Sequence, residues 1–240
     1  MDVSFKDKVV LVAGGTGGLG RAVSLAFLAE GAKTIVTYRA EPEFAALREA
    51  AADGATLLEG RRADVTDEAA VHGLVDAIAA RFGRLDVLVN AVGGYAGGIK
   101  LWELEKKTFD QMIALNLCSG FALVRAAVVP MLKRRSGAIV NVAAKAAFDH
   151  GAGASAYAAS KAAAVAMMDS LAEDLKGTGV RVNSILPSII DTEANRKAMP
   201  DANVATWPKP EDIARVVLFL ASDEAKVVHG AAVPVYGAGN

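Results

Sequence analysis

Short apolar runs and longer amphipathic stretches alternate along the whole chain. The apolar runs are rich in β-branched side chains and lie at residues 8–13, 34–38, 55–59, 85–90, 137–142, 180–186 and 232–236. Between them, apolar residues recur at helical spacing over residues 21–30, 43–52, 67–82, 109–133, 155–176 and 210–221. Runs that are apolar on both faces are typical of strands in a parallel sheet covered by helices on each side. The pattern therefore predicts a single α/β domain, 1–240, with one doubly wound parallel β-sheet of about seven strands.

Two segments depart from this alternation. Pro234 interrupts the last apolar run, which places that strand at a sheet edge, where a missing N–H is tolerated. Residues 195–207 are polar and irregular and contain Met199-Pro200 and Trp207-Pro208. We predict that the surrounding stretch, about 191–209, forms a lid over a substrate site.

Composition excludes several classes of function. The formal net charge of the chain is −1 and no Lys/Arg block occurs, so nucleic acid and anionic membrane are not expected partners. The single cysteine, Cys118, rules out an internal disulfide, and the three scattered histidines lack the spacing of metal ligands. The charged N-terminus is unlike a signal peptide, and we expect no apolar run to reach membrane-spanning length. We therefore expect a cytoplasmic protein that binds no metal.

A glycine-rich segment follows the first strand and opens the first helix. Residues 14–20 read Gly-Gly-Thr-Gly-Gly-Leu-Gly, with five glycines in seven positions. Glycines let the turn tighten and let a phosphate approach the backbone amides at a helix N-terminus. A merely tight strand-to-helix turn needs only one or two glycines, so phosphate binding is the favoured interpretation.

Tyr157 and Lys161 stand four residues apart in the Ser155–Lys176 helical stretch, so they share a helix face. A tyrosine hydroxyl normally loses its proton near pH ~10. A nearby ammonium favours the phenolate and lowers that pKa, which would make the pair a proton donor and acceptor near neutral pH. An isolated Tyr-x-x-x-Lys pair is more often an ordinary amphipathic helix face, and the other motifs of the chain decide against that reading.

Five motifs in this order resemble the short-chain dehydrogenase/reductase superfamily, whose Rossmann-type fold transfers hydride between a nicotinamide cofactor and a small substrate. They are Gly14-x3-Gly18-x-Gly20, Asp64, Asn90-Ala91-Val92-Gly93, Asn116 and Tyr157-x3-Lys161, and they cover essentially the whole chain. The resemblance implies that Tyr157 is the general acid, that Lys161 binds the nicotinamide ribose and lowers the Tyr157 pKa, and that Asn116 holds a relay water. It further implies cofactor contacts from Gly14, Thr16, Gly18, Leu19, Gly20, Tyr38, Arg39, Asp64, Val65, Asn90, Ala91, Gly93, Lys161, Pro187, Ile190 and Thr192. Among these, Asp64 and Val65 would meet the adenine, and Ile190 and Thr192 the carboxamide.

One position departs from the family pattern. The family has a substrate-orienting serine thirteen residues before its tyrosine, where this chain has Ala144. Alanine cannot donate a hydrogen bond to a developing oxyanion, and loss of one such donor costs about 2.7–4 kcal/mol in acyl transfer. Either catalysis is weakened or the substrate needs no such donor. Ser155 and Lys145 could replace it.

A narrower resemblance favours a substrate that needs no second donor. Ala144-Lys145-Ala146-Ala147 followed by Asp149 is similar to dihydropteridine reductase, a branch with alanine at the serine position. The glycine segment around Tyr95 and the segment ending at Trp207 resemble that branch's substrate floor and lid. The implied substrate is a quinonoid dihydropterin or a similar conjugated imine or quinone. Ala144, Lys145, Tyr95 and Trp207 are the candidate substrate contacts, although a solvated loop charge and simple lid packing would also explain Lys145, Tyr95 and Trp207.

The end of the second strand bears on the cofactor. An acidic residue there would accept the ribose 2′-OH of NAD and repel a 2′-phosphate. This chain has Tyr38 followed by Arg39, whose guanidinium can bind a phosphate, whereas animal-type dihydropteridine reductase has an aspartate. NADP(H) is therefore favoured over NAD(H), and the alternative is that Arg39 is a solvated charge.

Three functions remain open from the sequence. The first is an NADPH-dependent reductase similar to dihydropteridine reductase, the second is a general carbonyl or 3-oxoacyl reductase, and the third is a catalytically weak cofactor-binding protein. The expected partner is a small-molecule substrate. The many Ala and Met residues between 158 and 168 exceed what one buried face requires, so we also expect a homodimer or homotetramer.

Overall fold

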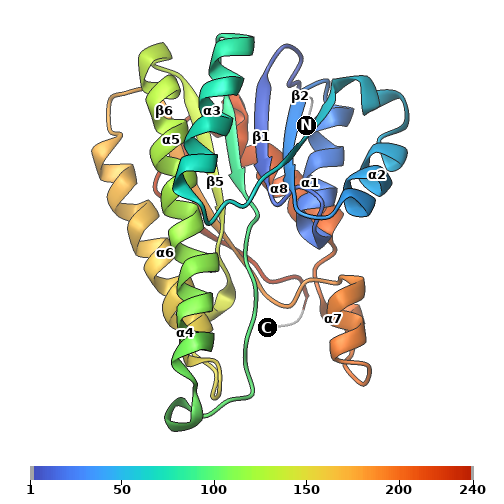
Figure 1. Ribbon diagram of the computed structural model, residues 1–240, viewed down its shortest axis with the longest axis vertical. Helices are drawn as coiled ribbons and strands as arrows, with labels where there is room; N and C mark the ends of the chain where they lie inside the picture. The colour runs from blue at the N-terminus through green and yellow to red at the C-terminus, as the bar shows by residue number, and fades with distance from the viewer. Residues whose placement is uncertain (1–2, 239–240) are drawn as a thin grey trace.

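The computed structural model describes residues 3–238 and contains a seven-stranded parallel sheet with helices on both faces (Figure 1). The strand order is β3-β2-β1-β4-β5-β6-β7. The strands are β1 (Val9–Ala13), β2 (Lys33–Tyr38), β3 (Leu58–Arg62), β4 (Val87–Asn90), β5 (Gly137–Val142), β6 (Val180–Pro187) and β7 (Ala232–Val235). The predicted single-domain, doubly wound α/β fold is confirmed, and β7, which carries Pro234, lies at an edge as expected.

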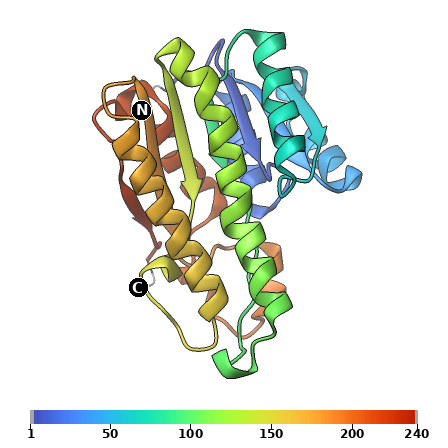
Figure 2. The ribbon, with the colours of Figure 1, turned by 60° about the vertical axis from the view of Figure 1, so that its left-hand side comes forward.

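The helices form two layers, one on each face of the sheet (Figures 1 and 2). One layer contains α1 (Gly18–Ala29), α2 (Glu41–Ala50) and α8 (Pro210–Ala221). The other contains α3 (Glu68–Phe82), α4 (Lys106–Ile113), α5 (Ser119–Arg134) and α6 (Ser155–Asp174). Each layer buries its own core, and alternate residues of the central strands point into one core or the other, because successive strand side chains face opposite sides.

The predicted boundaries of the strands and long helices agree with the structure within three residues. Four segments differ in detail. Helix α1 begins inside the glycine segment, at Gly18. Residues 52–57 form a 3₁₀ turn, so β3 begins at Leu58 instead of at residue 55. Helical structure before α5 starts at Lys106, and a π-helical turn, η3 (Ala114–Cys118), joins α4 to α5. The segment predicted to be irregular contains a short helix, α7 (Glu193–Ala198), which Thr192 caps by accepting a hydrogen bond from the Asn195 N–H.

The continuous helical stretch Lys106–Arg134 corrects our expectation about apolar length. By length and composition it could cross a membrane, although half of its most apolar window is buried inside the protein. Core helices of soluble proteins pass the same test, so this stretch is weak evidence for a membrane span.

The strand order fixes where a ligand can bind. The chain leaves β1 toward β2 and β3 on one side and returns to β4 and β5 on the other, so connections diverge between β1 and β4. In open α/β sheets, ligands bind beyond the carboxyl ends of the strands at such a point. Gly14 follows β1 there and Ala91 follows β4, and an added Cβ at Gly14 would lie 3.2 Å from the Ala91 carbonyl carbon.

Candidate active site

A cavity of about 710 Å³ lies at this edge of the sheet. Its floor comes from the segments that follow β4, β5 and β6, and one wall comes from the first turn of α6. Most of its lining is apolar or aromatic. Eleven predicted site residues line it, namely Leu19, Ala91, Gly93, Tyr95, Ala144, Lys145, Tyr157, Lys161, Pro187, Ile190 and Trp207.

The glycine segment is tight enough to need its glycines. An added Cβ at Gly20 would lie 2.0 Å from the Gly14 carbonyl oxygen, and one at Gly15 would lie 2.7 Å from Val36. Gly14 adopts a φ of 73°, and the Thr37 hydroxyl accepts a hydrogen bond of 2.8 Å from its N–H. No side chain caps the first turn of α1. Its free backbone N–H groups therefore fit the pyrophosphate of a dinucleotide cofactor.

Tyr157 stands on the first turn of α6, where Tyr95 covers one edge of its ring. The two ring centroids are 5.0 Å apart and the planes are nearly perpendicular, at 80°. Tyr95 itself is 69% exposed at the mouth of the cavity. Burial of the Tyr157 hydroxyl, followed by the nearby Tyr95, raises the pKa of Tyr157 to about 12.

Lys161 lies one helical turn further on and is buried. Its ammonium donates a hydrogen bond of 3.0 Å to the Val142 carbonyl at the end of β5. Burial lowers the pKa of Lys161 to about 8. We expected Lys161 to lower the pKa of Tyr157, but in this structure the Tyr157 pKa is raised, because desolvation of the phenol is the dominant cause.

Asn116 sits in η3 and ties three elements together. Its Oδ1 accepts a hydrogen bond of 2.9 Å from the Gly94 N–H, and its Nδ2 donates to the Gly94 carbonyl at 3.0 Å and to Ser160 Oγ at 3.1 Å. An added Cβ at Gly93 would lie 3.0 Å from both Asn116 Oδ1 and Lys161 Nζ. The π-helical turn therefore directs Asn116 into the floor, and Gly93 leaves room between the amide and the ammonium.

The residues considered as replacements for the missing serine are placed differently. Ala144 is buried and lines the cavity, so the family's serine position does face this space. Ser155 Oγ is buried without a hydrogen-bond partner among residues 3–238 and does not line the cavity, so it is not the replacement donor. Lys145 does line the cavity, together with Asp149.

The predicted adenosine contacts surround the end of β2 and do not line the main cavity. Tyr38 stacks on Phe44 with centroids 4.8 Å apart, and its hydroxyl donates to Glu41 Oε2 at 2.7 Å, which raises the pKa of Tyr38. Arg39 is exposed and close enough to Asp64 to contribute to lowering the Asp64 pKa, although hydrogen bonds from Thr66 contribute more.

Val65 and Asn90 are buried, and their side chains are used within the protein. Val65 is buried in the core beneath α3. Asn90 donates a hydrogen bond of 3.0 Å to Asn141 Oδ1, linking β4 to β5, and accepts one of 3.3 Å from the Val92 N–H. Thr16 is also engaged, since its hydroxyl donates to Glu43 Oε2 at 3.0 Å.

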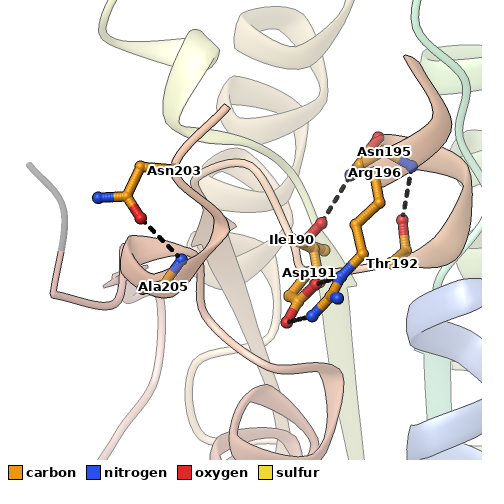
Figure 3. Close-up of polar contacts among 7 residues, drawn as sticks. All are labelled: Ile190, Asp191, Thr192, Asn195, Arg196, Asn203 and Ala205. Atoms are coloured by element: carbon orange, nitrogen blue, oxygen red, sulfur yellow. Dashed lines mark hydrogen bonds and ion pairs between the residues drawn. The ribbon is translucent and has the colours of Figure 1, made fainter. Parts of the chain in front are cut away.

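The segment after β6 forms a hydrogen-bonded cover beside the cavity (Figure 3). Asn195 Nδ2 donates to the Ile190 carbonyl at 2.8 Å, and Arg196 pairs with Asp191 through two hydrogen bonds. Thr192 reaches the glycine segment, because an added Cβ at Gly18 would lie 2.7 Å from its methyl carbon.

Sequence reasoning missed three residues that shape the site. Thr37 fixes Gly14, and nothing in its strand sequence distinguishes it. Ser160 accepts from Asn116 and donates to the Tyr157 carbonyl at 2.7 Å, and its position three residues after Tyr157 could have indicated a shared helix face. Asp149 lines the cavity, and its four-residue spacing from Lys145 was the available signal.

Comparisons with known proteins establish the family. A family model described as short chain dehydrogenase matches residues 8–203, so the chain belongs to the short-chain dehydrogenase/reductase family. Among curated relatives, D-threitol dehydrogenase of Mycolicibacterium smegmatis is 36% identical, and 98% of this chain and 94% of that protein are covered. The 3-oxoacyl-[acyl-carrier-protein] reductase FabG of Thermotoga maritima is 32% identical, with 96% of each chain covered. The solved structure "ElxO with NADP Bound" superposes with a TM-score of 0.91 at 26% identity and covers 96% of this chain and 97% of its own.

The lowered pKa of Lys161 predicts how stability depends on pH. Free lysine has a pKa of 10.5 and folded Lys161 one of about 8, so between these values the unfolded chain binds more protons. The free energy of unfolding of the cofactor-free protein should therefore rise from pH 8 to pH 10, by at most about 1.4 kcal/mol per pH unit for one proton. Tyr157 acts with the opposite sign only above its free pKa of 10.0.

Urea unfolding of wild type and Lys161→Met at pH 7.5, 8.5 and 9.5 measures this effect. The difference in unfolding free energy between the two proteins should change with pH, whereas the exposed-site control Lys106→Met should follow wild type. Parallel curves for wild type and Lys161→Met would show that Lys161 keeps an ordinary lysine pKa.

Proposed function

We propose that this protein is an NADP(H)-dependent reductase that transfers hydride to a small conjugated acceptor, a quinonoid dihydropterin or a similar conjugated imine or quinone. The observation that carries this proposal is the shortage of free hydroxyl donors in the cavity. Ser188 and Thr206 donate their hydroxyl protons to the carbonyls of Tyr236 and Asn203. Among the cavity-lining hydroxyls of the described residues, only those of Tyr95 and Tyr157 donate no hydrogen bond within the protein. Tyr95 is 69% exposed at the mouth, so Tyr157, one helical turn from the buried Lys161, is the proton donor that we assign to the reacting atom.

The proposed roles follow from the contacts of each side chain. A bound nicotinamide cofactor would supply the hydride. Tyr157, protonated at neutral pH because its pKa is about 12, donates the proton, which favours the direction of reduction. Lys161 is mainly cationic at pH 7 because its pKa is about 8, and its ammonium would hold the ribose of a bound nicotinamide cofactor. Asn116 is a positioning residue, since it fixes Gly94 and the turn that carries Lys161.

The cofactor segments also fit these roles. Gly14, Gly18, Leu19 and Gly20 would receive the pyrophosphate, with Thr16 beside it. Ala91, Gly93, Pro187, Ile190 and Thr192 would flank the nicotinamide half, and Asp64, Val65 and Asn90 would support the adenosine half and the floor. The segment 191–209 would act as the substrate lid.

A second candidate is a general carbonyl or 3-oxoacyl reductase, which the names of the FabG relatives favour. Ketone reduction places a full negative charge on one oxygen, and that oxygen is best stabilised by two donors. A conjugated acceptor spreads the incoming electrons over several atoms, so one proton donor suffices. Ala144 therefore discriminates between the two candidates.

Ala144→Ser should raise ketone turnover by one to two orders of magnitude, roughly 1.4–3 kcal/mol of transition-state stabilisation, and change quinonoid dihydropterin reduction little. Steady-state oxidation of NADPH with both substrate types measures the effect. The matched control is Ala147→Ser, which changes a buried alanine of the same segment that does not line the cavity. Brisk ketone reduction by wild type with no gain in Ala144→Ser would instead favour the carbonyl or 3-oxoacyl reductase.

For the cofactor, we propose that Arg39 binds the 2′-phosphate of NADP(H). The structure "ElxO with NADP Bound" is a family relative with that cofactor. The local charge is mixed, because Glu41 and Glu43 lie close to the same strand end and accept hydrogen bonds from Tyr38 and Thr16. Arg62 lies beside Tyr38 on the neighbouring strand, and we assign the phosphate contact to the exposed Arg39, which directly follows Tyr38 at the strand end.

Arg39→Asp should weaken NADPH binding at least tenfold more than NADH binding, because a charge-assisted contact is lost and a repulsive carboxylate is added. Fluorescence titration of both cofactors measures the two dissociation constants. Arg215→Asp, which changes a surface arginine on α8, should leave both unchanged. If Arg39→Asp weakens the binding of NADPH and of NADH equally, Arg39 has no role in phosphate recognition.

We also propose that the protein is a cytoplasmic homodimer or homotetramer that associates through the α5 and α6 faces. These helices run side by side on one face of the sheet (Figure 2), and Phe121, Val129 and Leu132 of α5 are 40–47% exposed. Sedimentation at micromolar concentration should show dimer or tetramer, and Phe121→Glu should shift it toward monomer. Wild type that sediments only as monomer would contradict this assembly.

A further inference from the structure

Lys145 and Asp149 place opposite charges next to each other on one wall of the cavity. The Lys145 Nζ and Asp149 Oδ2 atoms are 3.4 Å apart, and both residues line the cavity. The turn η4 (Lys145–Ala147) fixes their spacing, because the N–H groups of Phe148 and Asp149 both donate to the Lys145 carbonyl at 3.0 Å. The two side chains therefore leave the same short, hydrogen-bonded turn.

The two charged groups are farther apart than in a strong hydrogen bond. Charge-assisted N–H···O bonds are usually about 2.7–2.9 Å long, shorter than the 3.4 Å between Lys145 and Asp149. The Lys145 ammonium also lies 5.1 Å from the centre of the Tyr236 ring, which limits its movement. The Lys145 side chain is 30% exposed and that of Asp149 is 67% exposed. Both groups thus keep hydrogen-bonding capacity for a ligand.

The rest of this chamber offers mainly flat or apolar surfaces. Tyr95, Ile189, Met199 and Trp207 contribute to its lining. The side-chain amide of Asn195, also in the lining, already donates to the Ile190 carbonyl. A cation beside a carboxylate is therefore the chief polar feature away from Tyr157 and Lys161.

We propose that Lys145 and Asp149 recognise the edge of a planar heterocycle in which a carbonyl adjoins an N–H, as in a cyclic amide or an aminopyrimidinone. Lys145 donates to the carbonyl oxygen and Asp149 accepts from the N–H. An anionic substrate group fits less well, because the carboxylate of Asp149 would repel it. This inference rests on the proposed function, and it assigns the orientation of a conjugated substrate to these two residues.

Calorimetric binding to the protein–NADP⁺ complex tests the recognition of this edge. The probes are pterin, which carries the carbonyl and the N–H, and 3-methylpterin, in which a methyl group replaces that hydrogen. Wild type should bind pterin at least tenfold more tightly, because a site built to pair an N–H leaves a polar group unpaired with the methylated analogue. Asp149→Ala, which removes the acceptor, should reduce this preference to about twofold or less. Lys145→Met removes the donor to a carbonyl that both probes carry, so it should weaken the binding of both about equally.

A matched control lies on α4. Lys106 and Asp110 have the same four-residue spacing, with Nζ and Oδ2 2.7 Å apart, but they do not line the cavity. Lys106→Met and Asp110→Ala should retain the wild-type affinities and the preference for pterin. Equal binding of the two probes to wild type, absence of binding at millimolar concentration, an unchanged preference in Asp149→Ala, or unchanged affinities in Lys145→Met would overturn the inference.

Turnover separates this inference from the proposed function. If wild type prefers pterin over its methylated analogue yet reduces neither quinonoid dihydropterin nor 9,10-phenanthrenequinone, the edge recognition stands and the proposed reaction fails. If wild type reduces phenanthrenequinone, which has no amide edge, but binds both pterins equally, the reaction stands and the recognition by Lys145 and Asp149 fails.

Discussion

The buried ammonium of Lys161 is the constraint on which the site depends. A desolvated charge is unfavourable unless it is hydrogen-bonded, and here the ammonium donates a hydrogen bond to the Val142 carbonyl. That contact ties the first turns of α6 to the end of β5. Gly93 must remain without a side chain, because an added Cβ would lie 3.0 Å from Lys161 Nζ. The position of the Lys161 ammonium thus explains why the floor after β4 has no side chain at residue 93.

The π-helical turn at Ala114–Cys118 belongs to the same arrangement. Such turns insert an extra residue into a helix and often occur at functional sites. Here the turn allows Asn116 to face Gly94 and Ser160 while α5 continues along the sheet and packs into the core. Asn116 therefore links the floor after β4 to the turn of α6 that carries Lys161 through hydrogen bonds on both sides.

The sequence alone predicted those elements whose residues carry a strong local pattern. Apolar runs predicted all seven strands, and the glycines at 14–20 predicted a tight turn that the contacts of Gly15 and Gly20 require. The sequence did not predict features that depend on tertiary contacts, such as the burial of a particular side chain. The burial of the Tyr157 and Ser155 hydroxyls cannot be read from spacing, because it depends on which neighbours exclude water. Nor can spacing foresee the start of β3, since residues 55–57, which we predicted as strand, belong to a 3₁₀ turn that their apolar character does not distinguish.

The contacts of the lid connect the two halves of the cavity. Thr192 caps α7 and also touches Gly18 at the first turn of α1, where the pyrophosphate of a cofactor would lie. Two residues before Thr192, the backbone carbonyl of Ile190 accepts a hydrogen bond from the Asn195 side chain. Ile190 and Asn195 both line the substrate chamber. A cofactor bound at the glycine segment would therefore lie next to the residue that begins this cover, so the two halves of the cavity share one structural element.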